Sequence, residues 1–361
     1  MTDDTPRPAT PIWLRALMAL VLLAAAAVIY KAVSLSQIHG GPVRLREPSG
    51  MVRLQREGEV TLAVPDEPLR AGDRILTEPG GAVFLDYAGG TRARITGDGF
   101  LRIPDEPIGH LILQRGALAI DTRERTDGPF AVTIPTGALQ LAQARCTVFA
   151  TGPENEIRVG TGTAVLQAAG ERVELGPDTT VLLTADGLRR LPPPLVTVDC
   201  DGQVPDLSTY PPEAAVRWRA GRSAITGLGS IEVEAGTARM PERWGAIAIP
   251  VSLPDGRAAG SVSAYLRCNR YTTPEARWVL GVREHDGDVW LLATGEAEAL
   301  AAERWTRIAG SLEAPLGLQH RGGDGALDPT QVQAVLIGAG HEALAFLLDD
   351  IRILPAIAPG S

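Results

Sequence analysis

The sequence predicts an almost all-β protein in which an apolar N-terminal segment precedes two β-rich modules. Its 361 residues suffice for two ordinary domains, and a hydrophobic content of 45% excludes a disordered chain. The 40 glycines and 28 prolines indicate many turns, and apolar residues alternate over short stretches with little helical spacing. Short strands joined by tight turns are therefore expected over most of the chain.

Charge and cysteine content exclude several classes of function. A net charge of −9 provides no basic field to attract nucleic acid. Cys146, Cys200 and Cys268 are too few and too widely spaced for a disulfide framework or a zinc site, so at most one pair could bridge. The five histidines lack metal-binding spacing, and no nucleophile elbow or phosphate loop occurs. The sequence predicts no catalytic residues.

The N-terminal segment indicates the compartment. Residues 16–30 are uncharged and apolar, and flanking apolar residues extend the stretch over 12–34, long enough to cross a bilayer. A cleaved signal peptide is the alternative, but Val28 to Lys31 follow the alanine run before the chain turns polar, which favours a retained anchor. We expect residues 1–11 to form a short cytoplasmic tail at the inner membrane, with the bulk of the chain exported to the periplasm or cell surface.

The exported part divides by composition. A polar stem covers 35–50, alternating strands cover 51–190, a segment with six prolines covers 191–212, and a second strand-rich stretch covers 213–356. Five of the six tryptophans follow residue 215, so the two stretches are expected to have separate cores. The proline-rich segment breaks the periodicity and is interpreted as a linker.

The first module resembles the FecR domain. The resemblance rests on LRAGDRILTEPGGAVFLDYAGGTRARI (69–95), LILQRGAL (111–118), FAVTIPTGALQLAQARCTVFA (130–150), IRVGTGTAVL (157–166) and LGPDTT (175–180). It implies an exported sensory or ligand-binding module of β-solenoid or sandwich type. Four glycines at expected strand reversals should take positive φ: Gly72, Gly80, Gly90 and Gly116. Asp73 and Thr91 are expected to cap turns through their side chains.

Two features depart from that family. Its best-known members restrain a sigma factor through a cytoplasmic N-terminal domain, whereas residues 1–11 are too short to hold even an isolated helix. The resemblance therefore does not imply anti-sigma activity. Cys146 stands where the family has glycine, which places that turn in doubt and would allow a disulfide with Cys200.

The second module is similar to galactose-binding-like jelly rolls, the β-sandwiches of many carbohydrate-binding modules. ERWTRI (303–308), LDPT (327–330) and the terminal FLLDDIRI (346–353) carry this resemblance. In related modules, acids on the first and last strands often hold a structural calcium ion. The resemblance implies that Asp349 or Asp350, with Glu232 or Glu234, could do so here; the alternative is that these acids cap turns or face solvent.

A sugar-binding face requires exposed aromatic rings beside polar groups. Strand parity assigns Trp278 and Trp290 to the core, whereas Trp244 and Tyr271 lie in polar, turn-rich stretches. These two residues, together with Arg270, are the candidate ligand-binding residues; the alternative is that they cover a core edge. The acids of EHDGD (284–288) are interpreted as a hairpin turn, not as a catalytic carboxylate pair.

The leading hypothesis is a single-pass envelope protein whose modules bind or sense a glycan or another envelope protein. A structural envelope scaffold without a small ligand is the second hypothesis, and a polysaccharide hydrolase is the third. A glycan array separates the first two, and turnover of labelled polysaccharides tests the third.

Overall fold

The computed structural model describes residues 43–361, except 79, 106–108, 152–153, 185, 199, 201–205, 222–229, 237–243, 272, 301–303, 341 and 357–361. The predicted tail, the anchor and residues 35–42 of the stem lie outside the described residues. Residues 43–49, also assigned to the stem, instead form a strand of the first module, with Val43 and Leu45 in its core. No helix among the residues described is both long and apolar enough to span a bilayer. The described chain is all-β, as expected, with a single four-residue helix, α2 (Ala297–Leu300).

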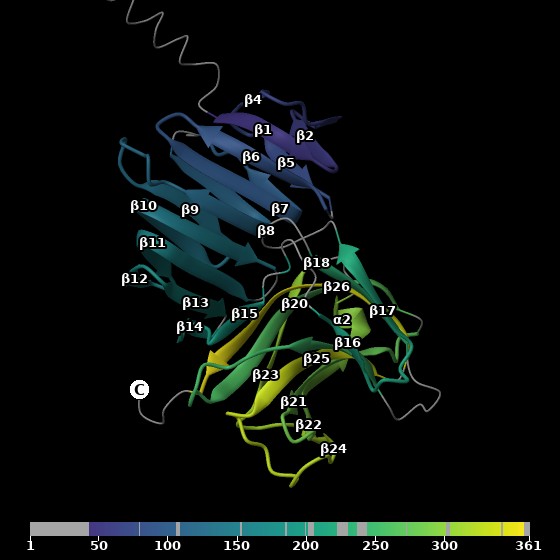
Figure 1. Ribbon diagram of the computed structural model, residues 1–361. Coiled ribbons are helices and arrows are strands. Elements are labelled where there is room, and N and C mark those ends of the chain that lie inside the picture. The colour runs from purple at the N-terminus through teal and green to yellow at the C-terminus, as the bar shows by residue number, and fades with distance from the viewer. Residues whose placement is uncertain are drawn as a thin grey trace, which may run out of the picture. The chain divides into compact units, whose positions relative to one another are not determined.

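The first module is one 14-stranded sheet (Figure 1). Its strands are β1 (Val43–Ser49), β2 (Val52–Arg56), β3 (Glu59–Leu62), β4 (Pro68–Leu69), β5 (Arg74–Thr77), β6 (Ala82–Tyr87), β7 (Thr91–Arg102), β8 (His110–Asp121), β9 (Phe130–Ile134), β10 (Gly137–Ala150), β11 (Asn155–Ala168), β12 (Glu171–Leu175), β13 (Thr179–Thr184) and β14 (Gly187–Leu191). The main path runs β14-β13-β11-β10-β9-β8-β7-β5-β2-β3, and among its described residues only β8 and β9 pair in parallel.

Alternation of apolar and polar residues builds the core of the first module. In β9, Phe130, Val132 and Ile134 are buried while the residues between them are half-buried, as expected for a period of two. The four predicted turn glycines all have positive φ, although Gly116 lies within β8 and not at a strand reversal. At Gly116 a Cβ atom would lie 2.6 Å from the Cα of Gly99, so close strand approach excludes a side chain there.

Asp73 caps its turn, as predicted. Its Oδ2 accepts the backbone N–H of Arg70 at 2.8 Å and a guanidinium N–H of Arg56 at 2.7 Å. The disulfide suggested for Cys146 is not formed. Cys146 lies in the core of the first module and Cys200 in that of the second, and neither is disulfide-bonded.

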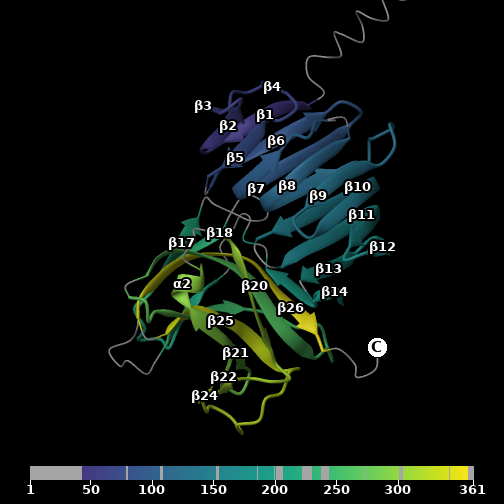
Figure 2. The ribbon, with the colours of Figure 1, turned by 180° about the vertical axis from the view of Figure 1, so that it is seen from behind.

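The second module is a β-sandwich of two six-stranded sheets, shown in green to yellow in Figure 2. One sheet has the order β17-β18-β26-β20-β23, with β15 beside β26: β15 (Val196–Val198), β17 (Val216–Gly221), β18 (Ser230–Ala235), β20 (Ala259–Tyr271), β23 (Thr306–Ser311) and β26 (Leu344–Pro355). The other has the order β16-β19-β25-β21-β22-β24: β16 (Ser208–Tyr210), β19 (Gly245–Pro250), β21 (Arg277–Glu284), β22 (Val289–Glu296), β24 (Gly317–His320) and β25 (Val332–Gly340). Leucine, isoleucine and valine side chains from both sheets fill the core between them.

The segment predicted as a linker contributes strands to both sheets of the sandwich. Val196–Val198 pair with Ile351–Ile353 of β26, and Ser208–Tyr210 pair with Ala246–Ala248 of β19. Its apolar residues therefore add to the second module, although its prolines interrupt the sequence periodicity. The segment differs in this respect from the free connection that the prolines suggested.

Residues 43–361 form one compact unit, and a buried ionic network joins the two modules within it. Arg158 of β11 forms ion pairs with Glu156, at 2.5 Å, and with Asp350 of β26. Glu156 also accepts a hydrogen bond from the hydroxyl of Tyr265, at 2.9 Å, and Arg352 lies 3.1 Å from Asp350. Side-chain exposures of 3% for Glu156 and 5% for Asp350 make this a desolvated network.

An aromatic contact accompanies the network. The rings of Phe149 and Tyr265 stack with centroids 5.1 Å apart, in a small apolar cluster that also contains Ala117, Trp305 and Leu347. Sheet residues of both modules thus share one cluster, and the modules do not meet through polar surface alone.

Candidate functional site

A hollow of about 300 Å³ opens beside Trp244 in the second module. The lining residues are Tyr210, Pro211, Pro212, Glu213, Trp244, Gln319 and His320. They come from the end of β16, from the residue before β19 and from the end of β24. An aromatic pair, a carboxylate, an amide and an imidazole therefore border one cavity.

Strand pairing explains why these residues meet. Tyr210 is opposite Ala246 in the β16–β19 pair, and Trp244 lies two residues before Ala246, hence on the same face. Ile247 and Ile249 of β19 face the sandwich core, so Ala246 and Ala248 face away from it. The hollow therefore lies on the outer face of its sheet.

The Trp244 ring is the fixed side of this hollow. It is only 7% exposed, and it lies across Gly281, where a Cβ atom would be 2.9 Å from a ring carbon. Its Nε1–H donates to the Oε1 of Gln319 at 3.3 Å. The Tyr210 ring, with its centroid 5.7 Å away at an interplanar angle of 57°, is half-buried and offers the more accessible aromatic surface.

The other tryptophans considered in the sequence have different surroundings. Trp278 and Trp290 pack against the sandwich core, as strand parity predicted, but both are only half-buried. Trp290 donates from Nε1 to a carboxylate oxygen of Glu284 at 2.7 Å. Trp244 lies outside this core, as expected, yet it is more buried than either, because a second apolar cluster forms on the outer face around it.

Arg270 and Tyr271 lie at a different hollow, on the other sheet. This groove of about 270 Å³ is lined by Ala215, Arg217, Glu234, Ala235, Gly236, Arg270, Tyr271, Ala343, Leu344 and Ala345. The structure thus brings together two of the three predicted ligand-binding residues and separates them from Trp244. Tyr271 also packs against the sandwich core.

The residues considered for calcium have other partners. Both carboxylate oxygens of Glu232 accept hydrogen bonds from Arg219, at 2.8 and 2.9 Å, and Asp350 pairs with Arg158 and Arg352. Asp349 is fully buried and accepts the backbone N–H of Asp350 at 2.7 Å. Glu234 lies at the groove of Arg270 and Tyr271. Calcium at any of these four carboxylates stays a prediction.

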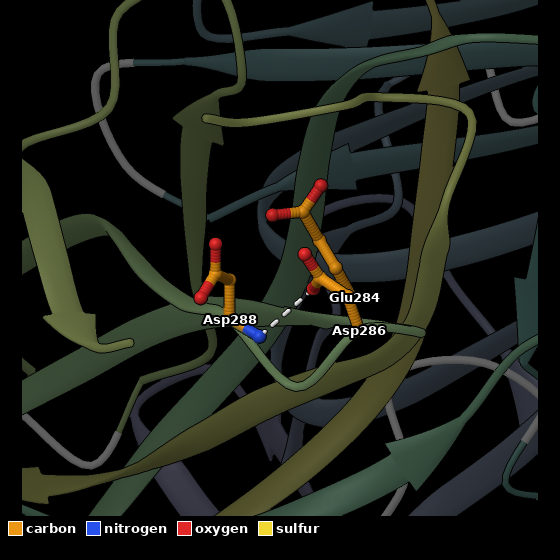
Figure 3. Close-up of side chains that lie close together, drawn as sticks. All are labelled: Glu284, Asp286 and Asp288. Carbon is orange, nitrogen blue, oxygen red and sulfur yellow. Dashed lines mark hydrogen bonds between the residues drawn. The ribbon is translucent and has the colours of Figure 1, made fainter. Parts of the chain in front are cut away.

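The one group of carboxylates close enough to share a cation, among the residues that the structure describes, is Glu284, Asp286 and Asp288. Figure 3 shows the three side chains side by side on the hairpin between β21 and β22. This confirms that EHDGD forms a hairpin turn. Candidate ligand oxygens of the three lie within 4.8 Å of one another.

Backbone N–H groups already occupy much of this acidic hairpin. Asp288 accepts N–H groups from Gly322, Gly323 and Gly325, each at 2.7 Å, and Glu284 accepts that of Asp328 at 2.6 Å. The hydrogen bonds from Gly323 and its neighbours hold the pKa of Asp288 below its usual range, whereas burial raises the pKa of Glu284. Asp288 and Glu284 therefore hold the segment 322–328, which directly follows β24. Strand β24 itself carries Gln319 and His320.

Tyr210, Gln319 and His320 were not identified from the sequence. Tyr210 falls in the proline-rich segment, and its place beside Trp244 depends on the pairing of β16 with β19. Gln319 and His320 belong to a short strand whose polar residues resemble a loop. No local pattern indicates these positions.

Comparisons with known proteins give weak structural likeness only. No family model matches the chain, and no curated protein matches it. A putative anti-sigma factor from Parabacteroides distasonis is 17% identical, over 32% of this chain and 58% of that one, with a TM-score of 0.29. The family 11 carbohydrate-binding module of the cellulosomal cellulase Lic26A-Cel5E of Clostridium thermocellum is 18% identical, over 46% and 97%, with a TM-score of 0.33.

The xylan-binding domain CBM22-1 of Paenibacillus barcinonensis Xyn10C is 15% identical, over 46% of this chain and 96% of that chain, with a TM-score of 0.30. This chain spans little more than half the length of the anti-sigma factor. The matches include both kinds of protein that the sequence resemblances indicated. Their TM-scores near 0.3 carry no argument about ligand or activity.

Proposed function

We propose that this chain is a non-catalytic envelope protein whose second module binds a carbohydrate at the Tyr210–Trp244 hollow. The observation that carries the proposal is the meeting of two aromatic rings with Glu213, Gln319 and His320 around one cavity. The apolar face of a sugar ring packs on an aromatic ring, and its hydroxyl groups exchange hydrogen bonds with carboxylate, amide and imidazole groups. This hollow supplies both kinds of contact.

The two rings have different roles in this proposal. Tyr210 is the more accessible and provides the stacking surface, whereas the buried Trp244 ring forms the floor and orients Gln319 through its Nε1–H. This replaces the sequence-based hypothesis that Trp244 and Tyr271 form one platform. A rigid, largely preformed wall reduces the entropy lost on binding.

The remaining parts of the proposal rest on the sequence. The apolar segment 12–34 would anchor the chain in the inner membrane, with both modules in the periplasm or at the cell surface. The first module, through its resemblance to the FecR domain, would sense or bind another envelope component.

A glycan array of neutral oligosaccharides, probed with the full chain in detergent, tests the proposal. The best ligand is then titrated against wild type, Tyr210→Ala and the matched Tyr210→Phe. We expect Tyr210→Ala to lose affinity by roughly 1–3 kcal/mol, as for other aromatic anchors, and Tyr210→Phe, which keeps the ring, to retain most of it. Equal affinity of the alanine variant and wild type would reject the hollow as the site.

A structural scaffold is the second candidate, and the buried network of Glu156, Arg158 and Asp350 favours it. Such a network orders the two modules as one body, which a mechanical or spacing role requires. A scaffold predicts no glycan binding on the array. It also predicts that loosening the network impairs envelope integrity in cells, while variants of Tyr210 have no effect.

A further inference from the structure

The groove at Arg270 and Tyr271 has a different chemical character from the Tyr210–Trp244 hollow. Small residues form much of it, namely Ala215, Ala235, Gly236, Ala343 and Ala345, and the longer side chains of Arg217, Glu234, Arg270 and Tyr271 border it. Arg217, Glu234 and Arg270 are exposed. Val216 and Val233 of β17 and β18 face the core, so Arg217 and Glu234 lie on the outer face of the sheet. Arg270 lies on the same face, because a register shift after Cys268 places it opposite Ala345, the neighbour of the core residue Phe346.

Strand register arranges the charged residues in one row. Arg217 of β17 is opposite Glu234 of β18, Glu234 is opposite Ala345 of β26, and Ala345 is opposite Arg270 of β20. Neighbouring strands lie about 4.8 Å apart, which places the Cα atoms of the two arginines about 14 Å from each other. The methyl group of Ala345 leaves the space in front of Arg270 open.

The adjacent row of the same sheet provides an internal comparison. There Arg219 is opposite Glu232 and forms a two-pronged ion pair with it, and Leu347 is the β26 residue next in line. Neither Arg217 nor Arg270 forms an ion pair with a carboxylate of the described residues, although Glu234 lies in their row. Their planar guanidinium groups can each accept a carboxylate in a two-pronged arrangement.

We propose that this groove binds an acidic glycan, such as a uronic-acid polysaccharide. The sugar carboxylates would pair with Arg217 and Arg270, and a hydroxyl group would donate to Glu234. An anion without hydroxyl groups would gain nothing from Glu234, whose charge repels it. The mixture of two cations and one anion therefore favours an acidic sugar over a simple anion.

The inference goes beyond the proposed function, because the groove and the Tyr210–Trp244 hollow lie on different sheets of the sandwich. Each site can bind its ligand whether or not the other does. Variants of one set of residues therefore distinguish the two proposals.

The test is a titration of the full chain with an alginate oligosaccharide at low and high salt. The double variant Arg217→Gln/Arg270→Gln should lose affinity roughly tenfold or more, because it removes two charge-assisted contacts. The matched control Arg219→Gln, one row away and paired with Glu232, should bind as wild type does. Carboxyl-reduced oligosaccharide should bind the wild type much more weakly, and added salt should weaken alginate binding.

The proposal is overturned if the double variant binds alginate like wild type, if Arg219→Gln loses as much affinity as the double variant, or if wild type binds alginate no better than its carboxyl-reduced form. Loss of alginate binding in Tyr210→Ala, with the double variant unaffected, would assign the acidic glycan to the other hollow. Circular dichroism of each variant checks that these exposed substitutions leave the fold intact.

Discussion

Replacing Arg158 with leucine should destabilise the chain by disrupting the ionic network between the modules. Arg158 is 13% exposed, pairs with Glu156 and Asp350, and places its guanidinium carbon 4.2 Å from the centroid of the Phe149 ring. Removing one partner of a buried ion pair costs about 3–5 kcal/mol, because it leaves an uncompensated charge. Arg352 and Arg307 remain near the two carboxylates, so we expect a loss near the lower limit, about 3 kcal/mol.

Urea unfolding followed by circular dichroism measures this loss. The matched control is Arg219→Leu, which removes an arginine from an exposed ion pair and should cost no more than about 1 kcal/mol. A double-mutant cycle with Asp350→Leu should show a coupling free energy between the two positions. If Arg158→Leu costs no more than Arg219→Leu, or if the cycle shows no coupling, the network does not hold the modules together.

Three further predictions concern single side chains. Burial alone would raise the pKa of Asp350, but Arg158 and Arg352 outweigh burial and hold that pKa below its usual range. The stability that this carboxylate contributes is therefore present above about pH 4 and is lost as pH falls through the folded-state pKa. Urea midpoints that stay constant under acid would contradict this. Asp288→Asn should weaken the hydrogen bonds from three glycine N–H groups and destabilise the chain by about 1–3 kcal/mol in total. Hydrogen exchange of residues 322–325 should become faster, and unchanged exchange would show that Asp288 does not hold this segment. Burial raises the pKa of the Cys146 thiol to about 12, so the thiol should resist alkylation until the chain unfolds. Rapid labelling of the native chain would show that this strand is not buried.

The sequence predicts the local features of the fold well, because they depend on short-range patterns. The alternation of Phe130, Val132 and Ile134 specifies a half-buried strand, and the glycines at reversals specify positive φ. The proline-rich segment was harder to interpret, because Val196–Val198 acquire their role only by pairing with a strand about 155 residues later. Local sequence contains no signal for that partner.

The candidate site could be predicted only in part for the same reason. Trp244 and Tyr271 both lie in polar stretches, but strand order places them on different sheets and pairs Trp244 with Tyr210 instead. The acids of the final strand resemble metal ligands until the structure shows that Asp350 faces Arg158, 192 residues earlier in the chain. Charge complementarity between distant strands leaves no pattern that a single sequence reveals.

Hydroxyl-radical footprinting of the full chain, with and without a saturating neutral glycan from the array, tests the central claim most directly. The account predicts that the sugar protects Tyr210 and His320, which border the hollow, and leaves Tyr271 on the other sheet unchanged. Protection of Tyr271 without Tyr210, or binding that protects neither hollow, would contradict the assignment of carbohydrate binding to this site.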